Sequence, residues 1–296
     1  MKNILKKMYT WSSFPSLILL VSFIIINFII NPDFFNPLNI GGFLSYNVPL
    51  VCVSIGIAVV LLSGGIDISM GAIVCLVNVI FITLIGKGFG ITTAILCSLI
   101  SAVTIGSLNG VIISIFRVTP LLTTFATSSI AAGLALWIMP IPGGSAPMEF
   151  ISWYNSFALG LPVPLFFIIL CITFWILIKI TPLGVWIYAV GQNERKAFVS
   201  SIPVTLVKFF VYVFSSLLAG IGGIALTGSI GSGDPLAGLP LSLNTIAACV
   251  IGGISLYGGQ GNVIGSVFGS LFLGLVITAV QGANIPSFYQ DLASGL

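Results

Sequence analysis

Nine long apolar stretches constrain what this chain can fold into more than any other feature of its sequence. The hydrocarbon core of a bilayer is about 30 Å thick, so a helix needs about 20 apolar residues to cross it. Lipid offers no partner to an open strand edge, so these stretches are predicted to be helices. They cover Phe14–Ile30, Ser45–Ser63, Asp67–Ile85, Ile91–Phe116, Pro120–Met139, Pro162–Ile180, Phe209–Thr227, Leu243–Tyr257 and Val263–Gln281. The eighth is short and has glycines beside it, which indicates a broken or re-entrant element.

The composition agrees with a chain whose solvent is lipid. Of the 296 residues, 58% are hydrophobic and only 5% are charged, and the mean hydropathy is +1.23. A soluble domain carries roughly 25% charged residues, so the surface of this chain could not be wetted by water. We therefore predict an all-α membrane protein, a polytopic bundle of about nine transmembrane helices that forms a single domain over residues 1–296.

The few basic residues indicate an orientation. The first apolar stretch is long for a signal peptide, and Asn31-Pro32-Asp33 is no small-residue cleavage site, so we keep it as a permanent span. With the amino terminus in the cytoplasm and alternating sides, Lys87 is the single basic residue outside. Eight of the nine basic residues then lie inside, as the positive-inside rule requires: Lys2, Lys6, Lys7, Arg117, Lys179, Arg195, Lys196 and Lys208.

Several kinds of chemistry are excluded by what the chain lacks. There is no histidine and no Gly-rich loop ending in Gly-Lys-Ser/Thr, so the chain has no P-loop for ATP. The five cysteines lie in apolar runs, without the spacing of a disulfide framework or a metal site. We predict no catalytic residue, no metal, no cofactor and no nucleic-acid partner.

Asp67 is the one acid embedded in an otherwise apolar region. A carboxylate at mid-membrane is costly, so such a residue usually faces protein or a water-filled cavity. Because Asp67 follows Gly64-Gly65 directly before a span, it is either an N-cap for the free amides of that span or a pathway or gating residue. A related pattern, Ile251-Gly252-Gly253-Ile254, occurs near the other end of the chain. The pair indicates either helix-ending turns or the two halves of a transport pathway.

Other polar side chains also lie within the apolar stretches. Each most often joins one helix to another, but together they suit a pathway for a neutral polar solute. They are Asn78, Asn109, Thr123, Thr124, Thr127, Asn244, Thr245 and Gln281. From these and the Asp67 motif, the candidates for the pathway or its gate are Asp67, Ser69, Asn109, Asn244 and Thr245.

The longest cytoplasmic stretch, about residues 181–208, holds the densest charge cluster past the amino terminus. Its polar part from Gly191 to Ala197 is predicted to form a short helix outside the membrane, and Pro203 restarts the chain toward the next span. It is either a generic solvated loop or a docking surface for a soluble partner. The candidates for that coupling role are Gly191, Asn193, Glu194, Arg195, Ala197 and Ser200.

Three of these places together resemble the membrane subunits of ribose-type ATP-binding-cassette importers. The matching positions are Ser63–Ser69 with Gly71, then Gly191, Asn193, Glu194, Ala197, Ser200 and Ile202, then Gly252, Gly253, Ser255, Leu256, Gly258, Gly259 and Gly261. Within that family, Leu159–Leu165 and Ser201–Val204 are similar to a subunit of the autoinducer-2 importer.

The chain departs from this family at three places. Ser201 replaces a usual glycine, and Ser242-Leu243-Asn244 stands where many relatives have Glu-Leu-Asp. If those acids contact sugar in the relatives, the ligand here differs. Members also have about ten spans, and Pro286–Leu296 has the character of the approach to a tenth.

The resemblance implies a mechanism. Two permease subunits, identical or homologous, form a pathway across the bacterial plasma membrane, and two separate ABC ATPase subunits dock beneath them. An extracytoplasmic substrate-binding protein delivers a sugar or sugar-like solute. ATP-driven movement is passed through the cytoplasmic loop, a bistable element that switches access to the pathway. Three alternatives remain: a secondary transporter, an ABC permease for branched-chain amino acids, and an assembly factor without a substrate.

Overall fold

The computed structural model describes residues 13–283, and a helix occupies most or all of each predicted apolar stretch. The polytopic helical fold is therefore confirmed. These nine helices are α2 (Phe14–Ile30), α3 (Pro37–Leu62), α4 (Met70–Gly86), α5 (Ile91–Ser114), α6 (Pro120–Ile138), α8 (Val163–Lys179), α11 (Val204–Ile230), α12 (Leu241–Ile251) and α13 (Val263–Gly282). The predicted Lys2, Lys6, Lys7 and Pro286–Leu296 features lie outside the described residues.

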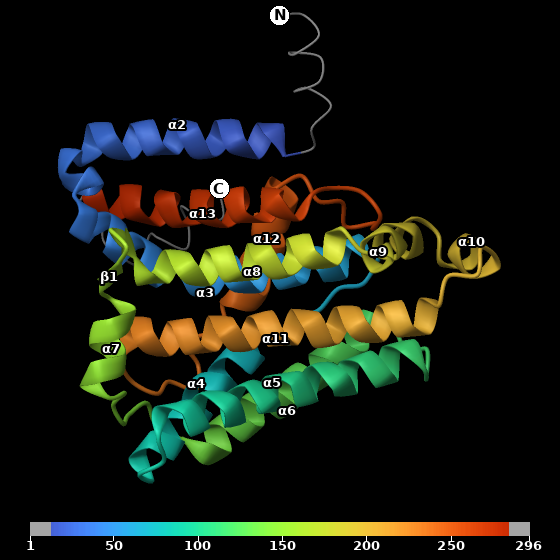
Figure 1. The fold of residues 1–296 in the computed structure, drawn as a ribbon, viewed down its shortest axis with the longest axis horizontal. Coiled ribbons are helices and arrows are strands. Elements are labelled where there is room, and N and C mark those ends of the chain that lie inside the picture. Colours follow the sequence, from blue (N-terminus) through green and yellow to red (C-terminus); the bar gives the residue numbers. More distant parts are fainter. Residues whose placement is uncertain (1–12, 284–296) are drawn as a thin grey trace, which may run out of the picture.

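Short elements join the long helices at the two ends of the bundle. At one end lie the 3₁₀ helix η1 (Pro32–Phe35), helix α7 (Met148–Tyr154) and a two-residue hairpin, β1 (Phe157–Ala158) with β2 (Leu161–Pro162). At the opposite end lie α9 (Pro182–Gln192) and α10 (Glu194–Val199), as Figure 1 shows. A short helix is present where Gly191 to Ala197 was predicted to form one, but this helix, α10, begins at Glu194 because Gly191 still belongs to α9. Its place outside the membrane stays a prediction, and α11 begins directly after Pro203.

Helix length separates the spans into two groups. Within the described residues, α3, α5, α6, α11 and α13 are long and apolar enough to cross a membrane by themselves. Helices α8 and α9 pass that test only as a pair, and they are bent by 83° where Pro182 follows Thr181. A residue before proline is disfavoured in a helix, which explains the break. Helices α2, α4 and α12 are shorter, and the count of nine spans stays a prediction.

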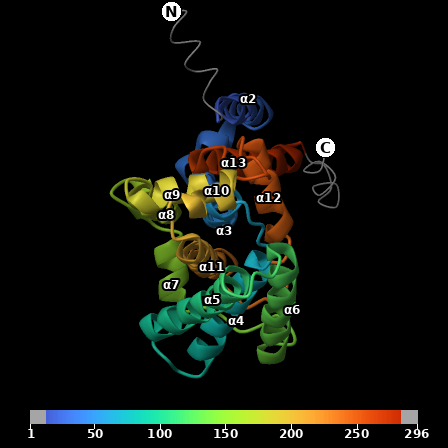
Figure 2. The same ribbon diagram turned by 90° about the vertical axis from the view of Figure 1, so that its right-hand side faces the viewer.

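Helix α3 forms the centre of the bundle. Of its most apolar 18 residues, 89% are buried, and it packs against α11, α13, α8 and α12. In Figure 2, α2 and α13 lie on one side of α3, and α11, α4, α5 and α6 lie on the other. Of the most apolar 18 residues of α5, only 28% are buried, and the same share holds for α6. One face of each helix is therefore free for lipid or another subunit. From Val48 to Leu62, every residue of α3 is buried by the helices around it.

The described charges separate along the bundle. Arg195 and Lys196 belong to α10, and Arg117 and Lys208 pair with Glu194 of the same helix. The α4–α5 connection, which holds Lys87, lies at the α7 end (Figure 1). This grouping agrees with the predicted inside and outside sets, while the side that each end faces stays a prediction.

Candidate functional site

The three motifs that carry the family resemblance meet at the α10 side of the bundle. The backbone N–H of Gly259 donates a hydrogen bond to the carbonyl oxygen of Leu62, at 2.9 Å. A Cβ on Gly191 would lie 1.9 Å from that same carbonyl oxygen and 2.7 Å from the Gly259 nitrogen. A Cβ on Gly258 would lie 2.7 Å from the Gly64 Cα. We call this contact of three turns, around Gly64, Gly191 and Gly258–Gly259, the glycine joint. A side chain on Gly191, Gly258 or Gly259 would force these backbones apart.

The two related glycine patterns are the same helix-ending turn. After α3, Gly64 has φ +80° and the Gly65 N–H donates to the Val60 carbonyl at 3.1 Å. After α12, Gly253 has φ +81° and the Ile254 N–H donates to the Cys249 carbonyl at 3.0 Å. This left-handed residue followed by a six-to-one bond is the Schellman motif. The helix-ending interpretation is therefore confirmed for both.

Asp67 is not the N-cap of the third span, so that prediction is wrong. Helix α4 begins at Met70, three residues after the predicted start at Asp67, and its N-cap position is Ser69. The Asp67 Oδ1 accepts from the Ser69 N–H at 2.9 Å and from the Ser69 hydroxyl at 2.5 Å. The free amide of Gly71 in the first turn of α4 instead donates to the Ser242 hydroxyl of α12, at 3.0 Å. The acceptor for this amide thus comes from Ser242, which lies 171 positions further along the chain.

Three of the five pathway candidates form one buried polar chain. The Asn109 side-chain amide donates to the Ser69 hydroxyl at 3.0 Å, and the Thr127 hydroxyl donates to the side-chain oxygen Oδ1 of Asn109 at 2.6 Å. With Asp67 these groups connect the α3–α4 turn to α5 and α6, and all of them are buried. Such bonds between membrane helices are worth about 1 kcal/mol each.

The other two candidates lie elsewhere. Thr245 is buried, and its hydroxyl donates within α12 to the Leu241 carbonyl at 2.7 Å. Asn244 is exposed on the same helix, next to Leu243, which is 72% exposed. A polar amide on an apolar outer face is expected to meet protein or water rather than lipid. Asn244 is therefore suited to a contact with another subunit, not to the buried chain.

Helix α10 is held by the residues predicted for it. The Asn193 side chain caps the helix by accepting from the Lys196 N–H at 2.9 Å, and Ala197 is buried. Glu194 accepts hydrogen bonds from Arg117 and from Lys208. Burial raises the pKa of the Glu194 carboxyl, but the hydrogen bond and charge of Lys208, with the charge of Arg117, bring the pKa below its ordinary value of 4.5. Arg195 and Ser200 are exposed.

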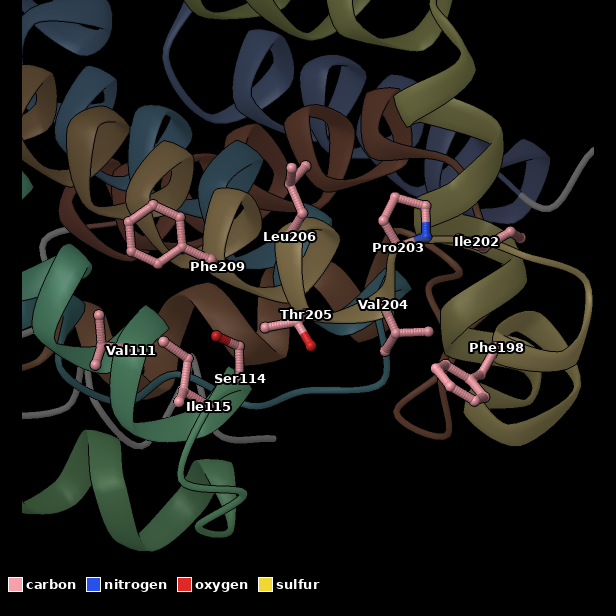
Figure 3. A pocket seen from close by; sticks show the side chains of 10 residues that line it. All are labelled: Val111, Ser114, Ile115, Phe198, Ile202, Pro203, Val204, Thr205, Leu206 and Phe209. Carbon is pink, nitrogen blue, oxygen red and sulfur yellow. The ribbon is translucent and has the colours of Figure 1, made fainter.

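A turn and a groove beside α10 add to this end of the molecule. Ser201 has φ +63°, the left-handed conformation for which glycine is the usual residue. An apolar groove of about 470 Å³ runs between α10, the first turn of α11 and the end of α5 (Figure 3). Phe198 lines it and is 69% exposed. The sequence analysis missed this groove, because its residues come from two segments about 80 positions apart.

This geometry defines the class of the protein. It is a polytopic helical membrane protein that has a charged helix and a glycine joint at one end. Residues 39–296 match the family described as branched-chain amino acid transport system permease component, and the chain belongs to that family. No solved structure matches it.

The curated relatives cover nearly the whole chain. The ribose import permease protein of Bacillus subtilis is 35% identical over 95% of this chain and 88% of its own length. The L-arabinose ABC transporter permease of Azospirillum brasilense is 32% identical over 89% of this chain and 78% of its own. The autoinducer 2 import system permease of Salmonella typhi is 31% identical over 97% and 89%. The predicted resemblance to permeases of ribose-type importers is confirmed.

Proposed function

We propose that this chain is the membrane-spanning permease subunit of an ABC importer for a sugar or sugar-like solute. The observation that carries the proposal is the similarity to ribose, arabinose and autoinducer 2 permeases over most of the chain. The glycine joint supports it, because it lies where a movement of α10 could reach the pathway residues. In this role the chain forms half of the pathway and leaves ATP hydrolysis to separate subunits.

The interior of the described chain favours a neutral solute. The family description names branched-chain amino acids, which carry both a positive and a negative group. A site for them needs a partner of each sign. Among the described residues, Asp67 is the one charged side chain that is buried, and the rest of the buried polar groups are hydroxyls and amides. Hydroxyls and amides suit the hydroxyl groups of a sugar.

The partners follow from the same assignment. An ABC importer works with ATPase subunits and a substrate-binding protein. We assign the ATPase docking surface to α10, where Arg195 and Lys196 are exposed. Arg195 lines a second hollow that shares Phe198 and Val204 with the apolar groove. A second permease subunit would cover the outer face of α12 around Asn244, and the binding protein would approach the α7 end from outside. The amino terminus would lie in the cytoplasm of a bacterial cell.

Uptake in a host that lacks its own sugar importers tests the proposal. The chain is expressed together with the ATPase and the substrate-binding protein of its importer, and labelled ribose, arabinose, autoinducer-2 and leucine are supplied in turn. We expect saturable uptake of one of the first three, lost when the ATPase is left out. Uptake of leucine would favour the amino-acid importer, and uptake without the ATPase would favour a secondary transporter.

Charge reversal tests the docking surface. Glu194→Lys leaves Arg117 and Lys208 without their partner, and we expect normal insertion but loss of ATPase co-purification. Glu149→Lys, on the exposed surface of α7 at the other end, is the matched control and should keep the ATPase bound. Equal co-purification from both variants would contradict docking at α10.

Labelling tests the orientation. Single cysteines at Glu149 and Gln192, both exposed, are placed in a cysteine-free chain. An impermeant thiol reagent added to intact cells should modify the first and not the second. The opposite pattern would reverse the orientation.

A further inference from the structure

Two buried polar atoms near the glycine joint have no hydrogen-bond partner within the described residues. They are the Asp67 Oδ2 and the Tyr212 hydroxyl, on side chains of residues that are 0% and 1% exposed. Asp67 belongs to the α3–α4 turn and Tyr212 to α11, so the two groups come from segments 145 positions apart. Buried polar groups are normally paired, and two exceptions near the same turn require an explanation.

The Tyr212 hydroxyl reaches the turn that carries Asp67. A Cβ on Gly65 would lie 2.3 Å from the Tyr212 hydroxyl oxygen, so the hydroxyl reaches the backbone of the turn two residues before Asp67. Gly65 is thus the position whose lack of a side chain admits the tyrosine to the turn.

The chemistry of the pair is complementary. A carboxylate oxygen accepts and a phenolic hydroxyl donates. No lysine or arginine within residues 13–283 forms an ion pair with Asp67, since both described ion pairs involve Glu194. A carboxylate buried without a cation depends on the hydrogen bonds that it accepts, and here Oδ1 takes both bonds from Ser69 while Oδ2 takes none. Tyr212 is the nearby donor that is still free.

The turn that carries Asp67 is also the one that the glycine joint contacts. Gly191, at the last turn of α9, packs on Leu62 and Gly64, and α10 begins three residues later. A displacement of α10 therefore bears on the turn through backbone contacts rather than through long side chains. This provides the movement that could bring Oδ2 and the hydroxyl together.

We propose that the transport cycle includes a second conformation, reached when the α3–α4 turn moves, in which Tyr212 donates a hydrogen bond to Asp67 Oδ2. Tyr212 is then a positioning residue that stabilises Asp67 in that conformation, and its hydroxyl is free in the conformation described here. The proposal rests on the proposed transport function.

Removal of one hydroxyl tests it. In Tyr212→Phe the melting temperature of the purified chain should not fall, because no bond is lost in this conformation. Uptake from the sugar panel should fall about tenfold, because a hydrogen bond to a charged group is lost in the other. Tyr154→Phe is the matched control: its buried hydroxyl already donates to the Ser45 carbonyl at 3.1 Å, so its melting temperature should fall while uptake per folded molecule persists.

The pair is tested by combining Tyr212→Phe with Asp67→Asn. If the two groups act through one bond, the double variant is no slower than the slower single variant. Uptake by Tyr212→Phe within twofold of the wild type, a multiplied defect in the double variant, or a fall in melting temperature as large as that of Tyr154→Phe would each overturn the proposal.

A second measurement needs no transported sugar. A cysteine at the half-buried Ile66 in the turn is labelled with a maleimide in the complex with its ATPase, without nucleotide and after trapping with vanadate and ATP. We expect a rate that depends on the nucleotide state, and Tyr212→Phe should remove that dependence. A wild-type rate that is the same in both states would overturn the inference. Absence of uptake from the whole sugar panel, with state-dependent labelling intact, would instead count against the proposed substrate class.

Discussion

The two ends of the bundle are held in different ways. At the α10 end, the glycine joint brings three turns into backbone contact, with few side-chain bonds between them. At the α7 end, side chains form hydrogen bonds that hold the loops in place. Asn78 donates to Thr227 at 2.9 Å and to the Ser232 carbonyl at 3.0 Å, and it accepts from the Asp234 N–H at 2.7 Å.

The difference shows how one bundle can combine a movable end with a fixed end. A backbone contact between glycines has no side-chain rotamer to rearrange, so the turns can shift as units. An amide that makes three directed bonds has one arrangement in which all are satisfied. We therefore expect motion to enter at α10 and the α7 end to remain rigid.

The largest effect is expected at the glycine joint. Gly191→Ala places a methyl group 1.9 Å from the Leu62 carbonyl oxygen, so two backbones must separate. Overpacking of this kind costs about 3 kcal/mol, and we expect a lower melting temperature together with loss of uptake. Gly133→Ala in α6 is the control, because no atom lies within 4 Å of its Cβ position, and it should be neutral or slightly stabilising. Equal melting temperatures for Gly191→Ala and Gly133→Ala would contradict close backbone packing at the glycine joint.

A smaller effect, with a different signature, is expected at the α7 end. Asn78→Ala removes three hydrogen bonds and leaves the Asp234 N–H without its acceptor, at a cost of about 2 kcal/mol. Melting temperature should fall while uptake per folded molecule stays near the wild-type value. Asn39→Ala, which loses one exposed bond to the Asp33 carbonyl, should change little. A large loss of turnover in Asn78→Ala with normal melting would mean that this end also moves.

Acid should weaken the α10 end slightly. The pKa of Glu194 is lowered in the folded chain, so its ion pairs stabilise the fold above its ordinary pKa of 4.5, and this contribution is lost as pH falls through the lowered pKa. The side chain is 39% exposed, so solvent screening limits the contribution to less than about 1 kcal/mol. Melting of the wild type and Glu194→Gln should differ at pH 7 and converge in acid. A difference that grows in acid would contradict the sign.

The smallest effect should be a gain. Ser201 adopts φ +63°, which costs a residue with a side chain about 1 kcal/mol relative to glycine. Ser201→Gly should therefore raise the free energy of unfolding by about 0.5 kcal/mol, after the added freedom of the unfolded chain is subtracted, and so raise the melting temperature slightly. Ser200→Gly, one position earlier and outside the left-handed region, should lower it. A loss at both positions would indicate that the turn is not strained.

Local sequence decided the helices of this protein. The backbone of a membrane segment must satisfy its own hydrogen bonds, so each apolar stretch could adopt one structure only. The helix-ending turns at Gly64 and Gly253 could also be predicted, because each turn is formed by residues that are neighbours in the sequence. The short helix α10 also followed from a local change in polarity.

Tertiary contacts decided the site. The sequence allows Asp67 to be either a helix cap or a pathway residue, because it precedes an apolar run, yet Ser242 on α12 supplies the acceptor to that helix. Asn109 and Thr127 join Ser69 while Asn244 and Thr245 do not, although the five have similar settings in the sequence. The partners of a side chain in a membrane bundle lie on other helices, tens of positions away. Which helices become neighbours depends on close packing of their surfaces. The sequence of one helix alone does not determine which other helix it packs against.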